Sequence, residues 1–198
     1  MADDTYRTIL TVAEGHYTEK RSRFISFAIP VRTAEEAKEW IDRYRRQYYD
    51  ARHVCWAYML GAERTVFRAN DDGEPSSTAG KPILGQINSN ELTDILIVVV
   101  RYFGGIELGT GGLTAAYRMA AAEAIAAVRI EVRTIDERIT IGFEYPYLNS
   151  VMRVVKEMQP AIVSRTFEAD CEMTLRIRKN ESGMLTKRLL AVESVFLK

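Results

Sequence analysis

Residues 95–128, ILIVVVRYFGGIELGTGGLTAAYRMAAAEAIAAV, contain the most informative pattern for the architecture of the N-terminal part of this 198-residue chain. Its first six residues, 95–100, are apolar on both alternating faces and rich in β-branched side chains, which predicts a central strand buried on both sides. The glycine-rich residues 104–112 follow, and the alanine-rich residues 113–128 then predict a helix that packs closely. A helix against a buried sheet is therefore the expected core of this region.

Shorter elements are predicted before this stretch. The pair Thr33 and Glu36 has the spacing of a capping box and predicts the start of a helix, in which apolar residues recur at helical spacing from Ala37 to Tyr48. Pro30 marks the end of the strand before it. The other elements expected here are strands at residues 5–12 and 24–31, a hairpin at 54–60 and 65–68, and a short helix at 83–87.

The last third of the chain predicts a second domain. Strands at residues 138–144, 161–168, 171–178 and 195–197 alternate with helices at 146–158 and 182–191 in the order βαββαβ, which is typical of a ferredoxin-like domain. Pro146 at the start and Pro160 just after the end support the bounds of the first of these helices. We therefore predict an α+β protein with one domain at residues 1–132 and another at 136–198.

Composition narrows the classes of function. Lys and Arg number 27, as do Asp and Glu, so the net charge is zero and a globally basic nucleic-acid binder of the histone kind is excluded. The two cysteines, Cys55 and Cys171, lie far apart in apolar runs, which is typical of a reducing compartment. No apolar run is long enough for a membrane span, and the acidic N-terminus lacks a signal peptide pattern. We expect a soluble cytoplasmic protein without a membrane partner.

Residues 71–82, DDGEPSSTAGKP, form a stiff loop that is rich in hydrogen-bonding groups. One interpretation is a turn in which Ser77 or Thr78 caps the following helix. The acidic cluster exceeds what a cap requires, and its spacing does not match an EF-hand, so no metal or other cofactor is predicted. The candidate binding residues in this loop are Asp71, Asp72, Glu74, Ser76, Ser77, Thr78, Gly80 and Lys81.

Residues 101–114 join the buried strand to the start of a helix, where free backbone N–H groups and the helix dipole favour an anion. Thr110 stands where a P-loop requires lysine, and Thr114 stands where the dinucleotide fingerprint requires its last glycine. Glycines that only permit tight strand-to-helix packing are the alternative. The candidate binding residues are Arg101, Tyr102, Phe103, Gly104, Gly105, Gly109, Thr110, Gly111 and Gly112, with Tyr102 and Phe103 expected on opposite faces.

Two smaller groups complete the candidate residues. Lys20, Arg21 and Arg23 form a basic cluster that is either a solvated turn or a contact for a phosphate backbone. His53 and Cys55 lie on one face of a strand, and a peptidase would require them to act together as a nucleophilic pair. Two residues on one strand face are more often structural, so His53 is retained only as a candidate for binding.

The two loops, DDGEPSSTAGKPIL at residues 71–84 and VVVRYFGGIELGTGGLTAAY at 98–117, together resemble the signature of the YigZ/IMPACT family. KRSRF at residues 20–24 and HVCWAY at 53–58 match two further family segments in the expected order. Ser77 is a departure, because many members carry glycine there. The resemblance covers residues 15–130, and the tail is similar to that of the bacterial YigZ branch.

The resemblance implies a first domain like domain 2 of ribosomal protein S-five and a second like domain five of elongation factor G. It also implies a link to translation, because the eukaryotic relatives are translation regulators. We therefore expect a non-catalytic protein that contacts RNA, the ribosome or a translation factor through residues 71–81 and 101–112. The alternative is a hydrolase or phosphate-ester enzyme with Asp72 or Glu74 as its base. The oligomeric state stays open.

Overall fold

The computed structural model describes residues 4–168 and 170–198, which form two compact units. The N-terminal unit consists of residues 6–133, and the C-terminal unit consists of residues 134–198 together with Asp4 and Thr5. The expected division at residues 132 and 136 assigned Asp4 to the first domain. Its carboxylate instead accepts two hydrogen bonds from Arg178, at 2.6 and 2.7 Å, and its carbonyl accepts one from the N–H of Ile135. These contacts between distant residues have no local signal in the sequence.

The N-terminal unit is built on a five-stranded antiparallel sheet in the order β2-β3-β6-β4-β5. Its centre is β6, and every residue from Ile95 to Arg101 of this strand is buried, as the apolar run predicted. The strands are β2 (Ala13–Glu19), β3 (Ser22–Pro30), β4 (His53–Leu60), β5 (Val66–Asn70) and β6 (Ile95–Tyr102). A separate two-stranded sheet pairs β1 (Thr5–Ile9) with β7 (Ile130–Thr134).

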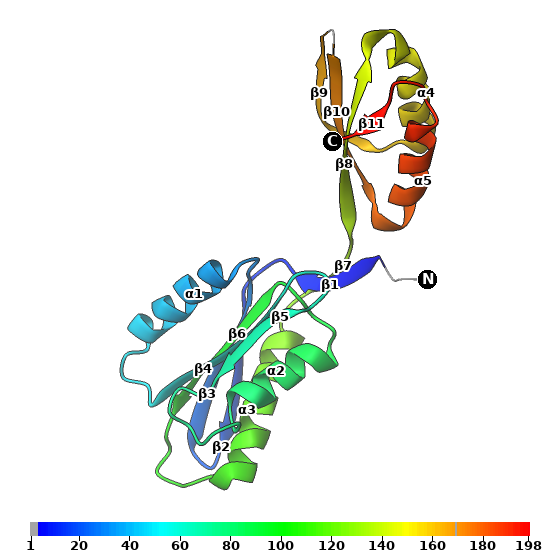
Figure 1. Cartoon of the computed structure of the whole chain (residues 1–198). Coiled ribbons are helices and arrows are strands. Elements are labelled where there is room, and N and C mark those ends of the chain that lie inside the picture. Colours follow the sequence, from blue (N-terminus) through cyan, green and yellow to red (C-terminus); the bar gives the residue numbers. More distant parts are fainter. Residues whose placement is uncertain (1–3, 169) are drawn as a thin grey trace. The chain divides into compact units, whose positions relative to one another are not determined.

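Helices cover both faces of the five-stranded sheet (Figure 1). On one face α2 (Gly80–Ser89) and α3 (Gly109–Ala126) form a core with the alternate side chains of β4 and β6. The other face packs against α1 (Ala34–Gln47), where Phe27 and Tyr44 stack with ring centroids 4.2 Å apart. The predicted cap of α1 is confirmed, because the hydroxyl of Thr33 accepts the N–H of Glu36.

The C-terminal unit has the predicted βαββαβ order. Its four strands are antiparallel in the order β11-β8-β10-β9, and α4 and α5 pack on one face, where twelve buried residues form the core. The elements are β8 (Asp136–Glu144), a 3-10 turn η1 (Tyr145–Tyr147), α4 (Leu148–Met158), β9 (Ala161–Phe167), β10 (Asp170–Arg178), α5 (Lys179–Leu190) and β11 (Phe196–Leu197).

Several elements differ from the expectation. Strand β2 was missed because its outward side chains are polar, and because Gly15, which faces α3, contributes no side chain: a Cβ there would lie 2.5 Å from the backbone N of Ala124. Strand β7 was interpreted as a domain linker. Helices α2 and α3 begin at Gly80 and Gly109, three and four residues before the expected starts, because their first turns contain glycines that weaken the helical pattern. Among the described residues, no helix is both long and apolar enough to cross a membrane.

Candidate functional site

The two predicted loops line a common pocket in the N-terminal unit, which we call the loop pocket. Its volume is about 580 Å³, and it brings together six of the candidate residues. Residues 74 and 75 of the first loop form one wall, and residues 107–110 of the second form another. The residues that line it are Arg52, His53, Glu74, Pro75, Arg101, Phe103, Glu107, Leu108, Gly109, Thr110 and Leu113.

A buried ion pair lies in the wall of the loop pocket. Glu74 and Arg101 are only 8% and 5% exposed, and Nη1 of Arg101 donates to Oε1 of Glu74 at 2.6 Å. The same oxygen accepts the hydroxyl of Tyr117 at 2.8 Å, and Nε2 of His53 lies 3.7 Å from Oε2. The carboxylate is therefore held by residues from three other segments of the chain, β4, β6 and α3. Because it is already paired, Glu74 is poorly placed to act as a catalytic base.

Asp71 organises the first loop. Its carboxylate accepts the N–H groups of Ser77, Ala79 and Gly80 at 2.8, 3.0 and 2.8 Å, so it closes the loop and caps the amino end of α2. The expected cap by Ser77 or Thr78 is therefore wrong, since the hydroxyl of Thr78 donates to the carbonyl of Pro75 instead. Aspartate can make this cap from outside the helix because the loop folds back on itself.

Asp72, the other candidate base, is also engaged. Its Oδ2 accepts the backbone N–H of Val54 at 2.7 Å, and its Oδ1 pairs with Arg45 at 2.8 Å. These contacts tie the loop to β4 and to α1. Neither of the two carboxylates proposed for catalysis is thus free of a structural partner.

The remaining residues of the first loop do not converge on the loop pocket. Ser77 has a φ of 66°, in the left-handed region that favours glycine, at the position where glycine was the expected family residue. Ser77 and Lys81 line a different hollow of about 770 Å³ between α2 and α3. Ser76 is exposed, and Gly80 packs so tightly that a Cβ would lie 2.6 Å from the backbone N of Asn70.

The basic cluster lies against the second loop. Lys20 and Arg21 form the two-residue connection between β2 and β3, with φ values of 43° and 67° that are those of a type I′ turn. A Cβ on Gly104 would lie 2.1 Å from the carbonyl carbon of Arg21, so the two backbones are in close contact. The hydroxyl of Ser22 accepts the N–H of Gly104 at 3.3 Å. The exposed cations are thereby placed next to the residue that follows Phe103.

Tyr102 and Phe103 differ in their surroundings, as their alternation predicts. The hydroxyl of Tyr102 donates to Asp50 at 2.9 Å, and the guanidinium of Arg23 lies 5.0 Å from the ring centroid. Phe103 follows the end of β6, is 52% exposed and lines the loop pocket. Phe103 is therefore the aromatic side chain that is available to a ligand there.

The glycines of the second loop have distinct positions. Gly105 and Gly109 have φ values of 85° and 69°, which L-residues rarely adopt. Gly109 begins α3 and lies in its first turn with Thr110, Gly111 and Gly112. Among the residues that the structure describes, no side chain is found to cap this end of the helix. The backbone N–H groups of the first turn are therefore presented beside the loop pocket without a side-chain acceptor.

Cys55 and His53 have separate partners. The thiol of Cys55 is buried and hydrogen-bonds the carbonyl of Asp71 and the hydroxyl of Tyr117, whereas Nδ1 of His53 hydrogen-bonds the carbonyl of Asp72 at 2.7 Å. Burial raises the pKa of the Cys55 thiol, and the nearby carboxylate of Glu74 raises it further. A nucleophilic thiol requires the opposite shift. The separate partners of Cys55 and His53 therefore do not support a peptidase that uses them as a nucleophilic pair.

We accordingly expect Cys55 to resist alkylation in the folded protein. Iodoacetamide at pH 8 should modify it at least about 100-fold more slowly than in the urea-unfolded chain, because the thiolate is scarce and enclosed. Peptide mass spectrometry against time measures both rates. Stoichiometric labelling of the native protein within the half-time of the unfolded one would contradict this account.

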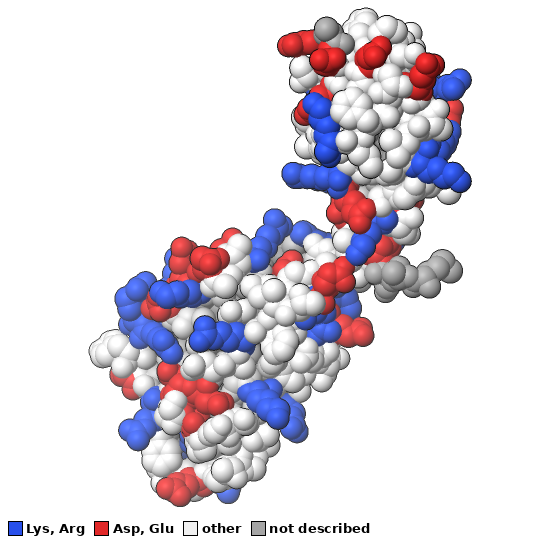
Figure 2. All heavy atoms as spheres, in the orientation of Figure 1, with Lys and Arg blue, Asp and Glu red and all other residues white. Residues whose placement is uncertain are grey.

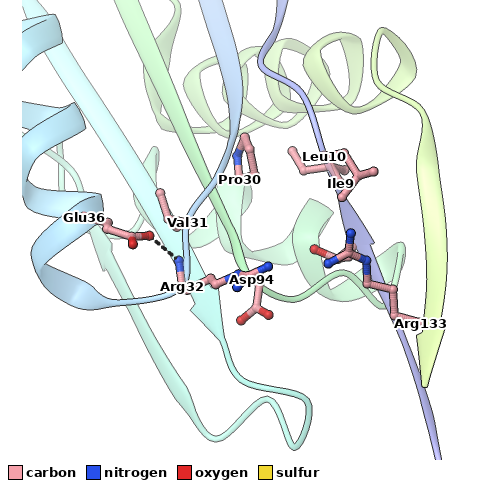
Figure 3. A pocket seen from close by; sticks show the side chains of 9 residues that line it. Ile9, Leu10, Pro30, Val31, Arg32, Glu36, Asp94 and Arg133 are labelled. Carbon is pink, nitrogen blue, oxygen red and sulfur yellow. Dashed lines mark hydrogen bonds between the residues drawn. The ribbon is translucent and has the colours of Figure 1, made fainter. Parts of the chain in front are cut away.

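Another hollow in the N-terminal unit, of about 320 Å³, contains none of the candidate residues (Figure 3). Two cations, Arg32 and Arg133, and two carboxylates, Glu36 and Asp94, line it. The backbone N–H of Arg32 donates to Glu36 at 2.7 Å, and Asp94 accepts the N–H of Gly61 at 2.8 Å. Its charges balance, and both carboxylates already have structural contacts.

Sequence reasoning missed several residues of the site. Arg52 has an available signal, since it is a cation directly before the strand that carries His53. Tyr117 is the one polar aromatic residue on the buried face of the alanine-rich helix, and this contrast also indicates a special contact. Glu107, Leu108 and Leu113 have no such signal, because the local sequence does not show which way they face.

These observations define the class of protein as an α+β protein of two units, whose candidate site is a pocket formed by two loops at the ends of the interior strands β4 and β6. Comparison with known proteins agrees with this description. Residues 20–125 match the Impact N-terminal domain, which spans both loops, the basic cluster and His53. The chain belongs to the IMPACT family.

The relatives extend beyond that domain. The chain is 32% identical over 183 residues to the IMPACT family member YvyE of Bacillus subtilis, covering 92% of this chain and 84% of the relative. It is 36% identical over 152 residues to the IMPACT family member YigZ of Escherichia coli, covering 76% and 74%. A crystal structure described as that of a hypothetical protein has a TM-score of 0.73 at 29% identity and covers 98% of this chain and 96% of its own.

Proposed function

We propose that this protein is a non-catalytic binding protein in translation regulation that contacts ribosomal RNA through the loop pocket and the basic turn beside it. The observation that carries the proposal is the packing of Gly104, the residue after the exposed Phe103, on the backbone of Arg21 in the exposed basic turn. Cations for phosphates and an aromatic face for bases are the two elements of single-strand recognition. Membership of the IMPACT family supports the link to translation. As part of the same proposal, the N-terminal unit is like domain 2 of ribosomal protein S-five, and the C-terminal unit is like domain five of elongation factor G.

The charge distribution supports a local contact. In the view of Figure 2, basic and acidic side chains are interspersed over the N-terminal unit, in keeping with the net charge of zero. Lys20, Arg21 and Arg23 are all exposed within four residues of chain, and the ion pairs found among the described residues involve none of them. They are therefore available to phosphate groups. A protein partner on the ribosome would instead be recognised through its own acidic surface, and the following experiment separates this outcome by comparing ribosomes with naked RNA.

The test is co-sedimentation with purified ribosomes and with ribosomal RNA across a potassium chloride series. We expect binding that weakens as salt rises, and a variant K20N/R21G/R23Q that binds at least about tenfold more weakly with a log–log salt slope reduced by about two. Asparagine and glycine are the preferred residues of a type I′ turn, so this variant removes the charges while keeping the hairpin. The loss of binding can then be separated from loss of fold.

The matched control is R153A/K156A/K187A, which removes three exposed cations from the C-terminal unit and so changes the net charge equally. Its binding should stay within about twofold of the wild type, because these cations lie outside the basic turn and exposed charges that make no direct contact are screened at physiological salt. Equal losses in both variants would overturn the location of the site. Absence of wild-type binding at low salt would overturn the proposal, and binding to ribosomes but not to naked RNA would shift it to a protein partner.

A further inference from the structure

We propose that the loop pocket binds one nucleoside 5′-phosphate, with the phosphate at the amino end of α3 and the base on the ring of Phe103. This nucleotide is either the 5′ end of an RNA or a free mononucleotide, which present the same chemical groups. In the first case the inference rests on the proposed function. The volume of about 580 Å³ lies within the roughly 300–1,000 Å³ range of small-ligand sites. The pocket therefore has room for a single nucleotide.

The phosphate position follows from the first turn of α3. Gly109 and Thr110 line the loop pocket, and no described side chain caps the helix, whereas Thr33 caps α1. A Cβ on Gly109 or Gly111 would meet nothing within 4 Å, so the space beside these N–H groups is open. The positive end of the helix dipole and unpaired N–H groups both favour a phosphate there.

A second and independent observation points to the same ligand. The side chain of Arg101 is 6% exposed and lines the loop pocket, yet its Nε is buried without a hydrogen-bond partner among the described residues. Burying one N–H donor without an acceptor is costly even though the rest of this guanidinium is paired, and such exceptions call for a reason. The oxygen of Glu74 that pairs with Arg101 also accepts the hydroxyl of Tyr117. A phosphate near the guanidinium would therefore add a second acceptor and further negative charge for Arg101. Arg52 adds an exposed cation on the pocket wall.

His53 lies on the wall of the loop pocket beside these cations. Its Nδ1 lies 2.7 Å from the carbonyl of Asp72, which can only accept, so Nδ1 carries a hydrogen. The ring is thereby tied to the first loop, and its Nε2 lies 3.7 Å from Oε2 of Glu74. The charged residues that line the pocket are Arg52, Arg101, Glu74 and Glu107.

The base position follows from Phe103. Its ring is 52% exposed although it adjoins a buried strand, and the guanidinium carbon of Arg101 lies 5.7 Å from the ring centroid. Stacking on an exposed aromatic ring tolerates every base, because each base has a π face. The base therefore stacks on the ring of Phe103, and we expect the site to discriminate only weakly between adenine and the other bases.

Calorimetric titration of the full chain with AMP, adenosine and inorganic phosphate tests the assignment. AMP should bind at least about tenfold more tightly than either fragment, because only AMP occupies both ends of the site. F103A should weaken AMP about tenfold and leave phosphate binding unchanged. E107Q should strengthen both AMP and phosphate several-fold, since it removes a like charge, and damage to the fold cannot produce such a gain.

Two controls match these variants. F67A removes an equally exposed ring, 57% accessible, from β5, and E123Q removes an exposed carboxylate from the other end of α3. Both should bind AMP as the wild type does. Inorganic phosphate binding as tightly as AMP would overturn the nucleotide assignment, and so would an unchanged affinity in both F103A and E107Q.

Short RNAs with a 5′-phosphate or a 5′-hydroxyl distinguish the two sources of the ligand. Preference for the 5′-phosphate places an RNA end in the pocket, whereas tight AMP binding without that preference assigns a free nucleotide. If neither AMP nor 5′-phosphorylated RNA binds at millimolar concentration, the inference is wrong. The proposed function survives that result as long as ribosome binding still responds to K20N/R21G/R23Q, so the two failures are distinguishable.

Discussion

Replacing Arg101 with methionine should lower the free energy of unfolding of the N-terminal unit by about 3–5 kcal/mol. The change leaves the carboxylate of Glu74 buried without its cation, with the hydroxyl of Tyr117 as its remaining close donor. Methionine fills a volume close to that of the arginine stem, so packing explains little of the loss. The effect thus measures the cost of an unpaired buried charge.

Urea unfolding followed by tryptophan fluorescence reports on the correct unit, because both tryptophans, Trp40 and Trp56, belong to residues 6–133. The double variant R101M/E74Q should recover at least half of the lost stability, since the glutamine carbonyl still accepts the Tyr117 hydroxyl and no charge remains buried. A loss below about 1 kcal/mol in R101M, or no recovery in the double variant, would show that the pair does not carry this energy.

The same ion pair shows what the sequence could not reveal. Arg101 was expected to offer its charge to a ligand, because it follows an apolar strand and precedes a glycine-rich loop. In the structure much of that charge is directed to Glu74, which lies 27 residues earlier in the chain. The long-range register of β4 and β6 brings the two segments together, and no local pattern encodes it. Composition indicated the two loops, but their partners depend on tertiary contacts.

Local signals succeeded where one chemical feature dominates. The apolar run of β6 predicted a strand buried on both faces, and Thr33 with Glu36 predicted the start of α1. They failed where glycine or polar residues leave no hydrophobic pattern. Strand β2 has polar side chains on its open face, and α3 begins among glycines that read as a loop. In β2 the pattern is missing because Gly15 packs closely on the backbone of α3, and in α3 it is missing because the helix begins at glycines. Close backbone packing and a glycine-rich helix end are also features of the candidate site.

Substituting alanine for Gly104 should destabilise the N-terminal unit by about 3 kcal/mol, near the upper end of the usual cost of overpacking. The new Cβ would lie 2.1 Å from the carbonyl carbon of Arg21, 2.3 Å from its oxygen and 2.4 Å from the N of Ser22. All three are backbone atoms, so no flexible side chain can move aside. Either the turn that carries Lys20 and Arg21 or the loop after Phe103 must shift.

G111A is the matched control, because it adds the same methyl group seven residues later in a place where nothing lies within 4 Å. Alanine at this helical position should raise stability by about 0.5–1 kcal/mol. The same urea titration measures both variants, and the opposite signs are the decisive feature. If G104A were as stable as the wild type, the turn and the loop would not be in contact, and the basic cluster would lose its connection to the loop pocket. If G104A is destabilised but folded, its ribosome binding should fall together with that of K20N/R21G/R23Q, because both changes act on one turn.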